Sequence, residues 1–162
     1  MKRLFITAAS TAIIGVLTFT GCSAPNDGAA NITVSDAKVR RALPGQTTAM
    51  GMLTIENTGG ADTLLSVSSP ISERIELHTH IVTDDGVMKM RRVEMMQIAA
   101  NSTLTLKSGG EHLMIFNAVI ADDAAIAPLT LTFKNSGDMT VKAMIVEPGQ
   151  MMRHGKMDHS GH

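Results

Sequence analysis

The stretch "THIVTDDGVMKM", Thr79 to Met90, has the pattern of a β-hairpin. Apolar and polar residues alternate on both sides of the Asp-Asp-Gly sequence at 84–86, and an Asp-Gly pair is a strong signal for a tight hairpin turn. The alternation predicts two antiparallel strands. The hairpin brings histidines of its first strand near methionines of its second, namely His78, His80, Met88 and Met90.

Segments of this kind recur along the chain. Nine of them combine β-branched residues with period-two alternation, at 32–40, 49–57, 62–69, 74–82, 86–94, 102–107, 112–120, 129–135 and 139–147. Turn-forming residues such as glycine, proline, asparagine and aspartate separate them. Because no convincing amphipathic helix lies between them, we predict an all-β fold, an antiparallel Greek-key β-sandwich of two sheets.

Residues 1–21 have the features of a lipoprotein-type signal peptide. They begin with Lys2 and Arg3, continue through an apolar stretch too short for the roughly 20 residues of a membrane span, and end with small residues before a cysteine. The ending "FTGC" resembles the lipobox of bacterial lipoproteins, which implies that Cys22 is lipidated. Ordinary cleavage that leaves a free thiol is the alternative. We therefore expect a protein of the periplasm or cell envelope that meets the membrane only through a lipid anchor.

The rest of the chain divides into three predicted parts. Residues 22–31 are small and polar, as a tether would be. Residues 32–149 form one β-domain, large enough for a single core, and we expect it to be a monomer. Residues 150–162 form a disordered tail, because they follow a Pro-Gly stop and offer no core of their own. Cys22 is the sole cysteine, so no intrachain disulfide can form.

Composition excludes some partners and raises one question. The formal net charge is −1 and no basic stripe with aromatic residues is present, so we expect no nucleic-acid binding. The chain has no Trp, no Tyr and four Phe, but 13 Met. Methionine fills irregular cores well, and we expect that role for five of them: Met50, Met52, Met95, Met139 and Met144.

Histidines and methionines also occur as pairs two residues apart within the predicted strands. Residues i and i+2 of a strand face the same side, so His112 shares a face with Met114, as His78 does with His80. Thioether sulfur binds Cu(I) well and Zn(II), Mg(II) or Ca(II) poorly, whereas imidazole is permissive. Thioether sulfur also forms no disulfide, so methionine suits an oxidising cell envelope. A mixed set of this kind favours Cu(I).

The spacing of these donors resembles a known family. His78, Thr79, ten residues, Met90, twenty-one residues, His112, Leu113 and Met114 reproduce the pattern H-(M)-x10-M-x21-H-x-M of the periplasmic copper chaperones called PCu(A)C. The words "DGVMKMR" and "GGEHLMIF" are similar to that family's as well, and the resemblance covers nearly the whole exported domain. Thr79 stands where the family has an optional methionine.

The resemblance implies a cupredoxin-like β-sandwich that binds Cu(I). It implies delivery of copper to the CuA centre of cytochrome c oxidase, sometimes alongside a Sco-type thiol protein. Carried over by position, the ligands are His78, Met90, His112 and Met114. His80 lies outside the motif and is either solvent-facing or an auxiliary ligand. Met88 is interpreted as a packing residue or a neighbour of the site, with auxiliary ligation as the alternative.

The tail is the third group of donors. It holds Met151, Met152, His154, Met157, His159 and His162. So short a tract enriched in histidine and methionine is typical of weak metal binding. We expect an auxiliary role in copper capture, including Cu(II), against the alternative of a merely polar end.

These observations favour a non-enzymatic copper chaperone that passes Cu(I) on from ligands at one edge of the sandwich, with Met90 and Met114 partly exposed. Copper sequestration for tolerance is the alternative within the same chemistry. A zinc hydrolase using His78, His80 and His112 and a structural or adhesion sandwich stay open. Blue-copper electron transfer needs a cysteine ligand, and no cysteine follows Cys22.

Overall fold

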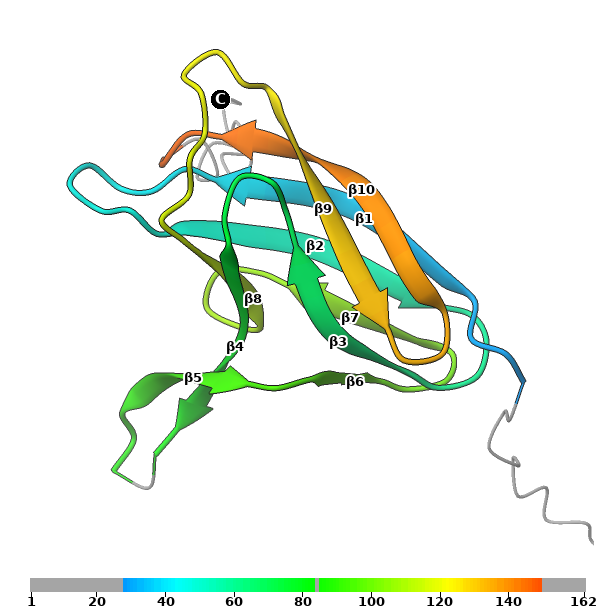
Figure 1. The fold of residues 1–162 in the computed structure, drawn as a ribbon. Coiled ribbons are helices and arrows are strands. Elements are labelled where there is room, and N and C mark those ends of the chain that lie inside the picture. The colour runs from blue at the N-terminus through cyan, green and yellow to red at the C-terminus, as the bar shows by residue number, and fades with distance from the viewer. Residues whose placement is uncertain (1–27, 84, 150–162) are drawn as a thin grey trace, which may run out of the picture.

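The computed structural model describes residues 28–83 and 85–149, and these form ten β-strands and no helix (Figure 1). The strands are β1 (Ile32–Arg40), β2 (Ala49–Asn57), β3 (Asp62–Ser68), β4 (Arg74–Val82), β5 (Met88–Val93), β6 (Met96–Ile98), β7 (Ser102–Leu106), β8 (His112–Phe116), β9 (Ile126–Phe133) and β10 (Gly137–Val146). The predicted all-β class is confirmed. Within the described ranges there is accordingly no helical segment that could cross a bilayer. The predicted signal peptide, most of the tether and the tail lie outside the described residues.

Each of the nine predicted segments contains a strand, and one strand was missed. β6 has only three residues, too few to show an alternating pattern. β8 stops at Phe116, short of the predicted end at 120, because Asn117 has a φ of 48° and leaves the extended conformation. β9 starts three residues before the predicted position and includes Pro128, which lies beyond the last β9 residue paired with β3. Its missing N–H therefore costs no bond to β3.

The strands pair in the order β5-β4-β8-β2-β1-β10-β9-β3-β6, and β7 pairs with β2 beside β8. All pairs along this path are antiparallel except β1 with β10, where the last strand of the described chain returns to lie parallel to the first. The hydrogen-bonded sheet is therefore mixed. It curls so that β3, near one end, contacts β4, near the other, and the β3–β9 part crosses in front of the β2–β7 part in Figure 1.

The interior is filled by alternate residues of the central strands. Leu113 and Ile115 of β8 are fully buried in one apolar cluster with residues of β2 and β9, such as Leu53 and Leu129. Each such side chain contributes roughly 1.5–3 kcal/mol by leaving water. Gly51 of β2 pairs with Leu113, and a Cβ at Gly51 would lie 2.9 Å from the Leu113 side chain. β8 therefore packs closely against β2, and this contact holds the positions of His112 and Met114 on either side of Leu113.

The five methionines predicted to fill the core do not all lie there. Met139 packs against the core as expected, and Met52 is buried. For Met95 and Met144 the core-filling prediction is wrong, because their side chains are 47% and 54% exposed. Met50 alternates with the core residues of β2 and lies on the opposite face, only half-buried. Leucine, isoleucine and valine occupy the core positions, so most methionine sulfur is left for the outer faces.

The end of the sheet remote from β5 is fastened by Asp62. Its carboxylate accepts hydrogen bonds from the backbone N–H groups of Thr63, Asn135 and Ser136 and from the Ser136 hydroxyl, at 2.6–3.0 Å. Burial raises the pKa of Asp62, but these hydrogen bonds outweigh it and hold that pKa below its usual value. The turn between β9 and β10 is thereby tied to the start of β3.

Candidate metal centre

All three strands predicted to carry metal donors adjoin at one end of the sheet, in the order β5-β4-β8. The register places His80 opposite Met90, Val82 opposite Met88 and His78 opposite His112. Directly opposed residues share a face, so the predicted hairpin geometry is confirmed. We call the surface formed by the following residues the donor face: His78, His80, Met88, Met90, His112 and Met114.

His112 is the most deeply placed residue of the donor face. Its side chain is 0% exposed, although it points away from the core that holds Leu113. Because Gly51 pairs with Leu113, the buried Met52 of β2 stands beside His112 on the same face. Its Nδ1 lies 2.8 Å from the carbonyl oxygen of Gly110, whereas its Nε2 is buried and has no hydrogen-bond partner.

The surroundings of His112 determine its protonation. A carbonyl oxygen can only accept, so Nδ1 carries the proton and donates to Gly110, and the neutral ring keeps a lone pair on Nε2. Burial lowers the pKa of His112, against the opposing effect of the Gly110 bond. A buried nitrogen without a partner is unusual in a folded protein. Nε2 of His112 is thus a lone pair held ready for a ligand.

His78 presents its other nitrogen. Its Nε2 lies 2.9 Å from Oε2 of Glu76, and its Nδ1 is buried without a hydrogen-bond partner. The bond from His78, followed by that from Arg74, holds the pKa of Glu76 below its usual value, so Glu76 is a carboxylate that accepts the Nε2 proton. Nδ1 is therefore the nitrogen of His78 that is left for a ligand. A carboxylate that orients an imidazole in this way is a common partner of metal-binding histidines.

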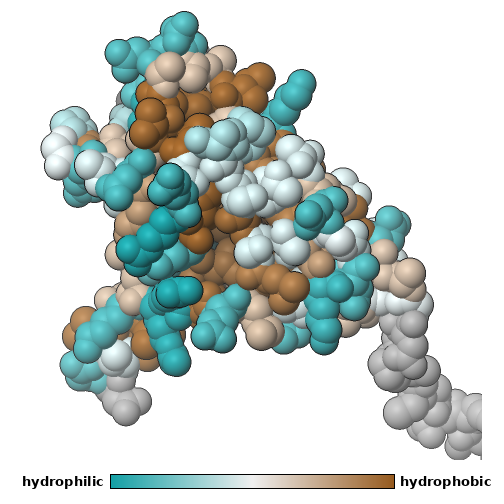
Figure 2. All heavy atoms as spheres, in the orientation of Figure 1, coloured by the Kyte–Doolittle hydropathy of each residue, from teal (hydrophilic) through white to brown (hydrophobic). Residues whose placement is uncertain are grey.

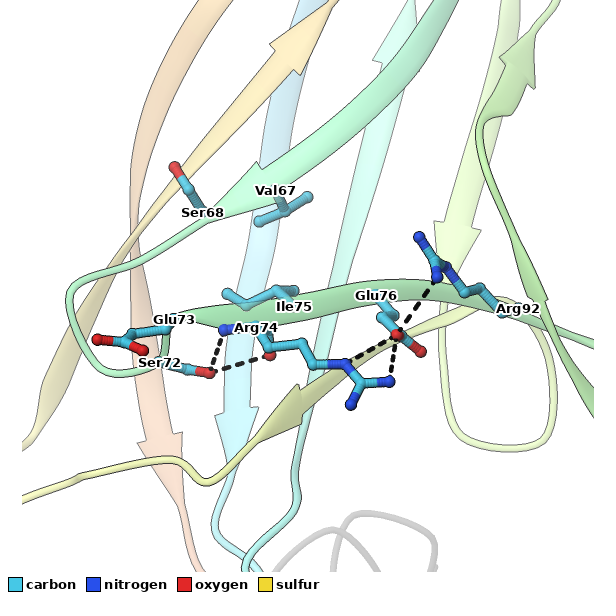
Figure 3. Close-up of a pocket in the computed structure, with 8 residues that line it drawn as sticks. All are labelled: Val67, Ser68, Ser72, Glu73, Arg74, Ile75, Glu76 and Arg92. Atoms are coloured by element: carbon cyan, nitrogen blue, oxygen red, sulfur yellow. Dashed lines mark hydrogen bonds and ion pairs between the residues drawn. The ribbon is translucent and has the colours of Figure 1, made fainter.

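Glu76 is itself held by arginines. Oε1 of Glu76 accepts bonds of 2.9 and 2.7 Å from Nε and Nη2 of Arg74, and Nη1 of Arg92 lies 3.7 Å away (Figure 3). The Arg74 guanidinium also stacks 4.4 Å from the centre of the Phe116 ring. Sequence reasoning missed Glu76, yet a signal was present: it precedes His78 by two residues and so shares its face.

The third histidine lies within the same group. The ring centre of His80 is 5.3 Å from that of His112, and the ring centre of His78 is 5.9 Å from it. Nδ1 of His80 lies 2.9 Å from the carbonyl oxygen of Gly110, which therefore accepts from two imidazoles. Gly109, with a φ of 82°, allows the turn that directs this carbonyl toward both rings.

The sulfur donors are more accessible than the imidazoles. Met90 and Met88 on β5 are 57% and 58% exposed, and Met114 on β8 is half-buried. Met88 and Met90, like Val82 and Val87, are exposed apolar residues of the β4–β5 hairpin, which projects from the body at the lower left of Figure 1 and shows brown and teal spheres together in Figure 2. An incoming ion or protein can reach the methionine end of the donor face directly.

The donors present fit a soft metal ion. Two imidazole nitrogens without hydrogen-bond partners, together with nearby thioethers, form the kind of set that Cu(I) prefers. Among the described residues, no three His, Cys, Asp or Glu side chains are grouped closely enough to hold a metal. The same face also presents the thioether sulfurs of Met88, Met90 and Met114, which a soft ion could bind together with imidazole. Cys22 and the six predicted tail donors lie outside the described residues.

Two sequence comparisons agree on the family. A family model described as "Putative lipoprotein LpqE-like" matches residues 32–145. The chain is also similar to "Putative lipoprotein Lxx21020" of Leifsonia xyli subsp. xyli, with 32% identity over 124 residues that cover 70% of this chain and 73% of that protein.

Solved structures with the same fold include copper-binding domains. The copper-bound PCuAC domain from PmoF2 matches with a TM-score of 0.62 at 21% identity, over 74% of this chain and 96% of that domain. Apo-DR1885 from Deinococcus radiodurans matches with a TM-score of 0.55 at 20% identity, over 91% and 97% of the two chains. Its Cu(I) form matches with a TM-score of 0.57 at 22% identity, over 70% and 76%. The PCu(A)C resemblance inferred from the His and Met spacing is confirmed at the level of the fold.

Proposed function

The chain belongs to the LpqE-like lipoprotein family and has the fold of the PCuAC domain, and on this premise we propose that it is an exported copper chaperone. In this proposal, Cu(I) is bound by His78, Met90, His112 and Met114 and passed to an acceptor by ligand exchange. The observation that carries it is the pair of buried imidazole nitrogens without partners, Nδ1 of His78 and Nε2 of His112, on a face that also presents thioethers.

Each ligand has a distinct task. His112 and His78 supply nitrogens whose lone pairs are held by the hydrogen bonds to Gly110 and Glu76. Met114, half-buried on β8, supplies the inner sulfur. Met90, exposed on β5, supplies a sulfur that an acceptor can displace without opening the core. The site needs no catalytic base, and we propose no enzymatic activity.

The wider setting follows from the family resemblance and the chain ends. A lipid on Cys22 would hold the monomeric domain at a membrane of the cell envelope, close to membrane-bound acceptors. The resemblance favours the CuA centre of cytochrome c oxidase as acceptor, with a Sco-type protein as a further partner. The tail at 150–162 would collect copper, including Cu(II), and deliver it to the donor face.

A competition titration with a chromogenic Cu(I) chelator tests the site. On a chain truncated after Gly149 we expect one tight site, severely weakened by Met114→Ser or by His112→Ala. Met95→Ser is the matched control, since Met95 is exposed and outside the donor face, and it should leave the affinity unchanged. Unchanged affinity in both donor-face variants would disprove the ligand assignment, and tighter binding of Zn(II) than of Cu(I) would favour a zinc protein.

A second assay separates delivery from sequestration. The Cu(I)-loaded chain is mixed with an apo-CuA domain, and the appearance of the copper centre in the acceptor is followed by absorbance. Delivery predicts transfer at stoichiometric concentrations. Copper that stays on this chain, while a competent donor empties under the same conditions, would identify a sequestering protein instead.

A further inference from the structure

We propose that His80 is an additional copper ligand, which with His112 and His78 gives the donor face a second, nitrogen-rich ligand set for Cu(II). This inference rests on the proposed copper-binding function and extends it to the oxidised form of the same cargo. Two ligand sets would then share His78 and His112. His80 would complete the set for Cu(II), and the methionines would complete the set for Cu(I).

The position of His80 supports its inclusion. In the β4–β5 ladder His80 is directly opposite Met90, whereas His78 is opposite Arg92. Its ring centre is 5.3 Å from that of His112, closer than the 5.9 Å between His78 and His112. Because a metal–imidazole bond is about 2.0 Å long, two rings on one metal have centres roughly 4.5 to 6 Å apart. Both separations fall in that range.

Hydrogen bonding leaves the correct nitrogen available. Nδ1 of His80 donates to the Gly110 carbonyl at 2.9 Å, as Nδ1 of His112 does at 2.8 Å. The carbonyl oxygen can only accept, so Nδ1 carries a proton in both rings and Nε2 is the nitrogen of each ring that is left for a metal. His80 is also half-buried and held in place, unlike a histidine that simply faces solvent. One carbonyl thus presets two imidazoles for binding through the same atom.

The chemistry of the set points to Cu(II). Imidazole nitrogen in a tetragonal arrangement suits Cu(II), while thioether sulfur favours Cu(I). The three rings do not yet converge on one point, since no three such side chains among the described residues are grouped to hold a metal. Binding of one ion therefore requires the rings to reorient, and the two ring-centre separations from His112 are those of ligands on a common ion.

The test compares both oxidation states in one background. The mature chain carries Cys22→Ser and His154→Ser, His159→Ser and His162→Ser, so that the N-terminal thiol and the tail imidazoles do not contribute. Into it are placed His80→Asn, Met90→Leu and, as a control on β10, Lys142→Gln. Asparagine can still donate to Gly110 from the position of Nδ1 but lacks Nε2, so the turn is preserved, and circular dichroism checks the fold.

Cu(II) and Cu(I) are titrated separately, and the nitrogens bound to Cu(II) are counted by pulsed electron paramagnetic resonance. His80→Asn should remove one imidazole and lower the Cu(II) affinity about tenfold or more, and lower the Cu(I) affinity by a smaller factor. Met90→Leu should lower the Cu(I) affinity by a larger factor than the Cu(II) affinity. Lys142→Gln should change neither affinity.

Two results would contradict the proposals, and they separate the role of His80 from the proposed function. If the parent chain binds Cu(I) but His80→Asn leaves the Cu(II) spectrum and affinity unchanged, His80 is not a ligand and the proposed function stands. If the parent chain fails to bind Cu(I), the proposed function itself is wrong.

Discussion

Strands β8 and β5 each carry a pair of possible metal donors, but the two pairs differ in how far they are buried. His112 and Met114 on β8, and Met88 and Met90 on β5, are each two residues apart and face the same side. β8 lies between β4 and β2, and its His112 is fully buried, whereas β5 is an edge strand paired with β4 alone and its methionines are exposed. The difference teaches that strand order, rather than alternation, decides which donors are held rigidly.

The edge position of β5 has a second consequence. An unpaired strand edge invites pairing with other chains, and charged side chains discourage it. β5 carries Lys89, Arg91 and Arg92, all exposed. Under the proposed function, these charges would leave the methionines of β5 open to a metal acceptor while discouraging pairing of the strand edge with other chains.

The largest expected effect on Cu(I) affinity comes from substitution of the buried His112 on β8. His112→Asn keeps a donor to the Gly110 carbonyl and removes Nε2, so it deletes a ligand with little change to the turn. We expect Cu(I) affinity to fall more than the roughly 10- to 100-fold that loss of an outer partner costs. Chelator competition measures it, with thermal unfolding as the fold control. A loss below threefold would mean that burial of His112 serves packing alone.

Glu76→Gln tests whether the rigidity of the imidazoles matters. The amide cannot match the charged acceptor that orients His78, so Cu(I) affinity should fall by roughly 10- to 100-fold. Glu73→Gln is the matched control, because Glu73 lines the same pocket as Glu76 but the hydrogen bond to His78 comes from Glu76. Equal effects of the two variants would show that the charge of the region, and not the contact with His78, is responsible.

Met90→Leu probes the exposed member. Because the imidazoles and Met114 remain in place, we expect Cu(I) affinity to fall by less than about tenfold, well below the loss of a buried ligand with its supporting contacts. The rate of transfer to an apo-CuA domain should change more than the affinity, since Met90 is exposed and an acceptor could displace its sulfur without opening the core. Stopped-flow mixing measures this transfer rate. If Met90→Leu weakens binding as much as His112→Asn does, the division into rigid and exchangeable halves is wrong.

The smallest effect on copper is expected from the far end of the sheet. Asp62→Asn removes a carboxylate that accepts four hydrogen bonds and should lower the free energy of unfolding by about 1–3 kcal/mol while leaving Cu(I) affinity unchanged. The pKa of Asp62 is lower in the folded state, so its stabilisation is present above the unfolded pKa and is lost as pH falls through the folded value. Denaturant titrations at pH 7 and pH 3 should therefore show a smaller difference in the variant. An equal pH dependence would argue against this role of Asp62.

Much of this molecule was predictable from short-range pattern. Nine strands and the β4–β5 hairpin follow from alternation and turn residues, and the shared face of His112 and Met114 follows from the period of two. β6 was missed because three residues show no period, and Met95 and Met144 were misplaced because composition alone does not say which face a methionine occupies.

The sequence by itself determined which residues could donate to a metal and which of them share a strand face, because side-chain direction in a strand is a local property. Only the tertiary structure decided which donors are buried and which nitrogen of each imidazole is available. Burial of His112 depends on β4 and β2 pairing on its two sides. The available nitrogen of His78 and of His112 is set by partners two residues away, Glu76 and Gly110, whereas that of His80 is set by Gly110 across strands. The pairing of β8 with β4 and β2 and the contact of Gly110 with His80 are set by strand order and register, which join residues far apart in the chain and leave no periodic trace in the sequence.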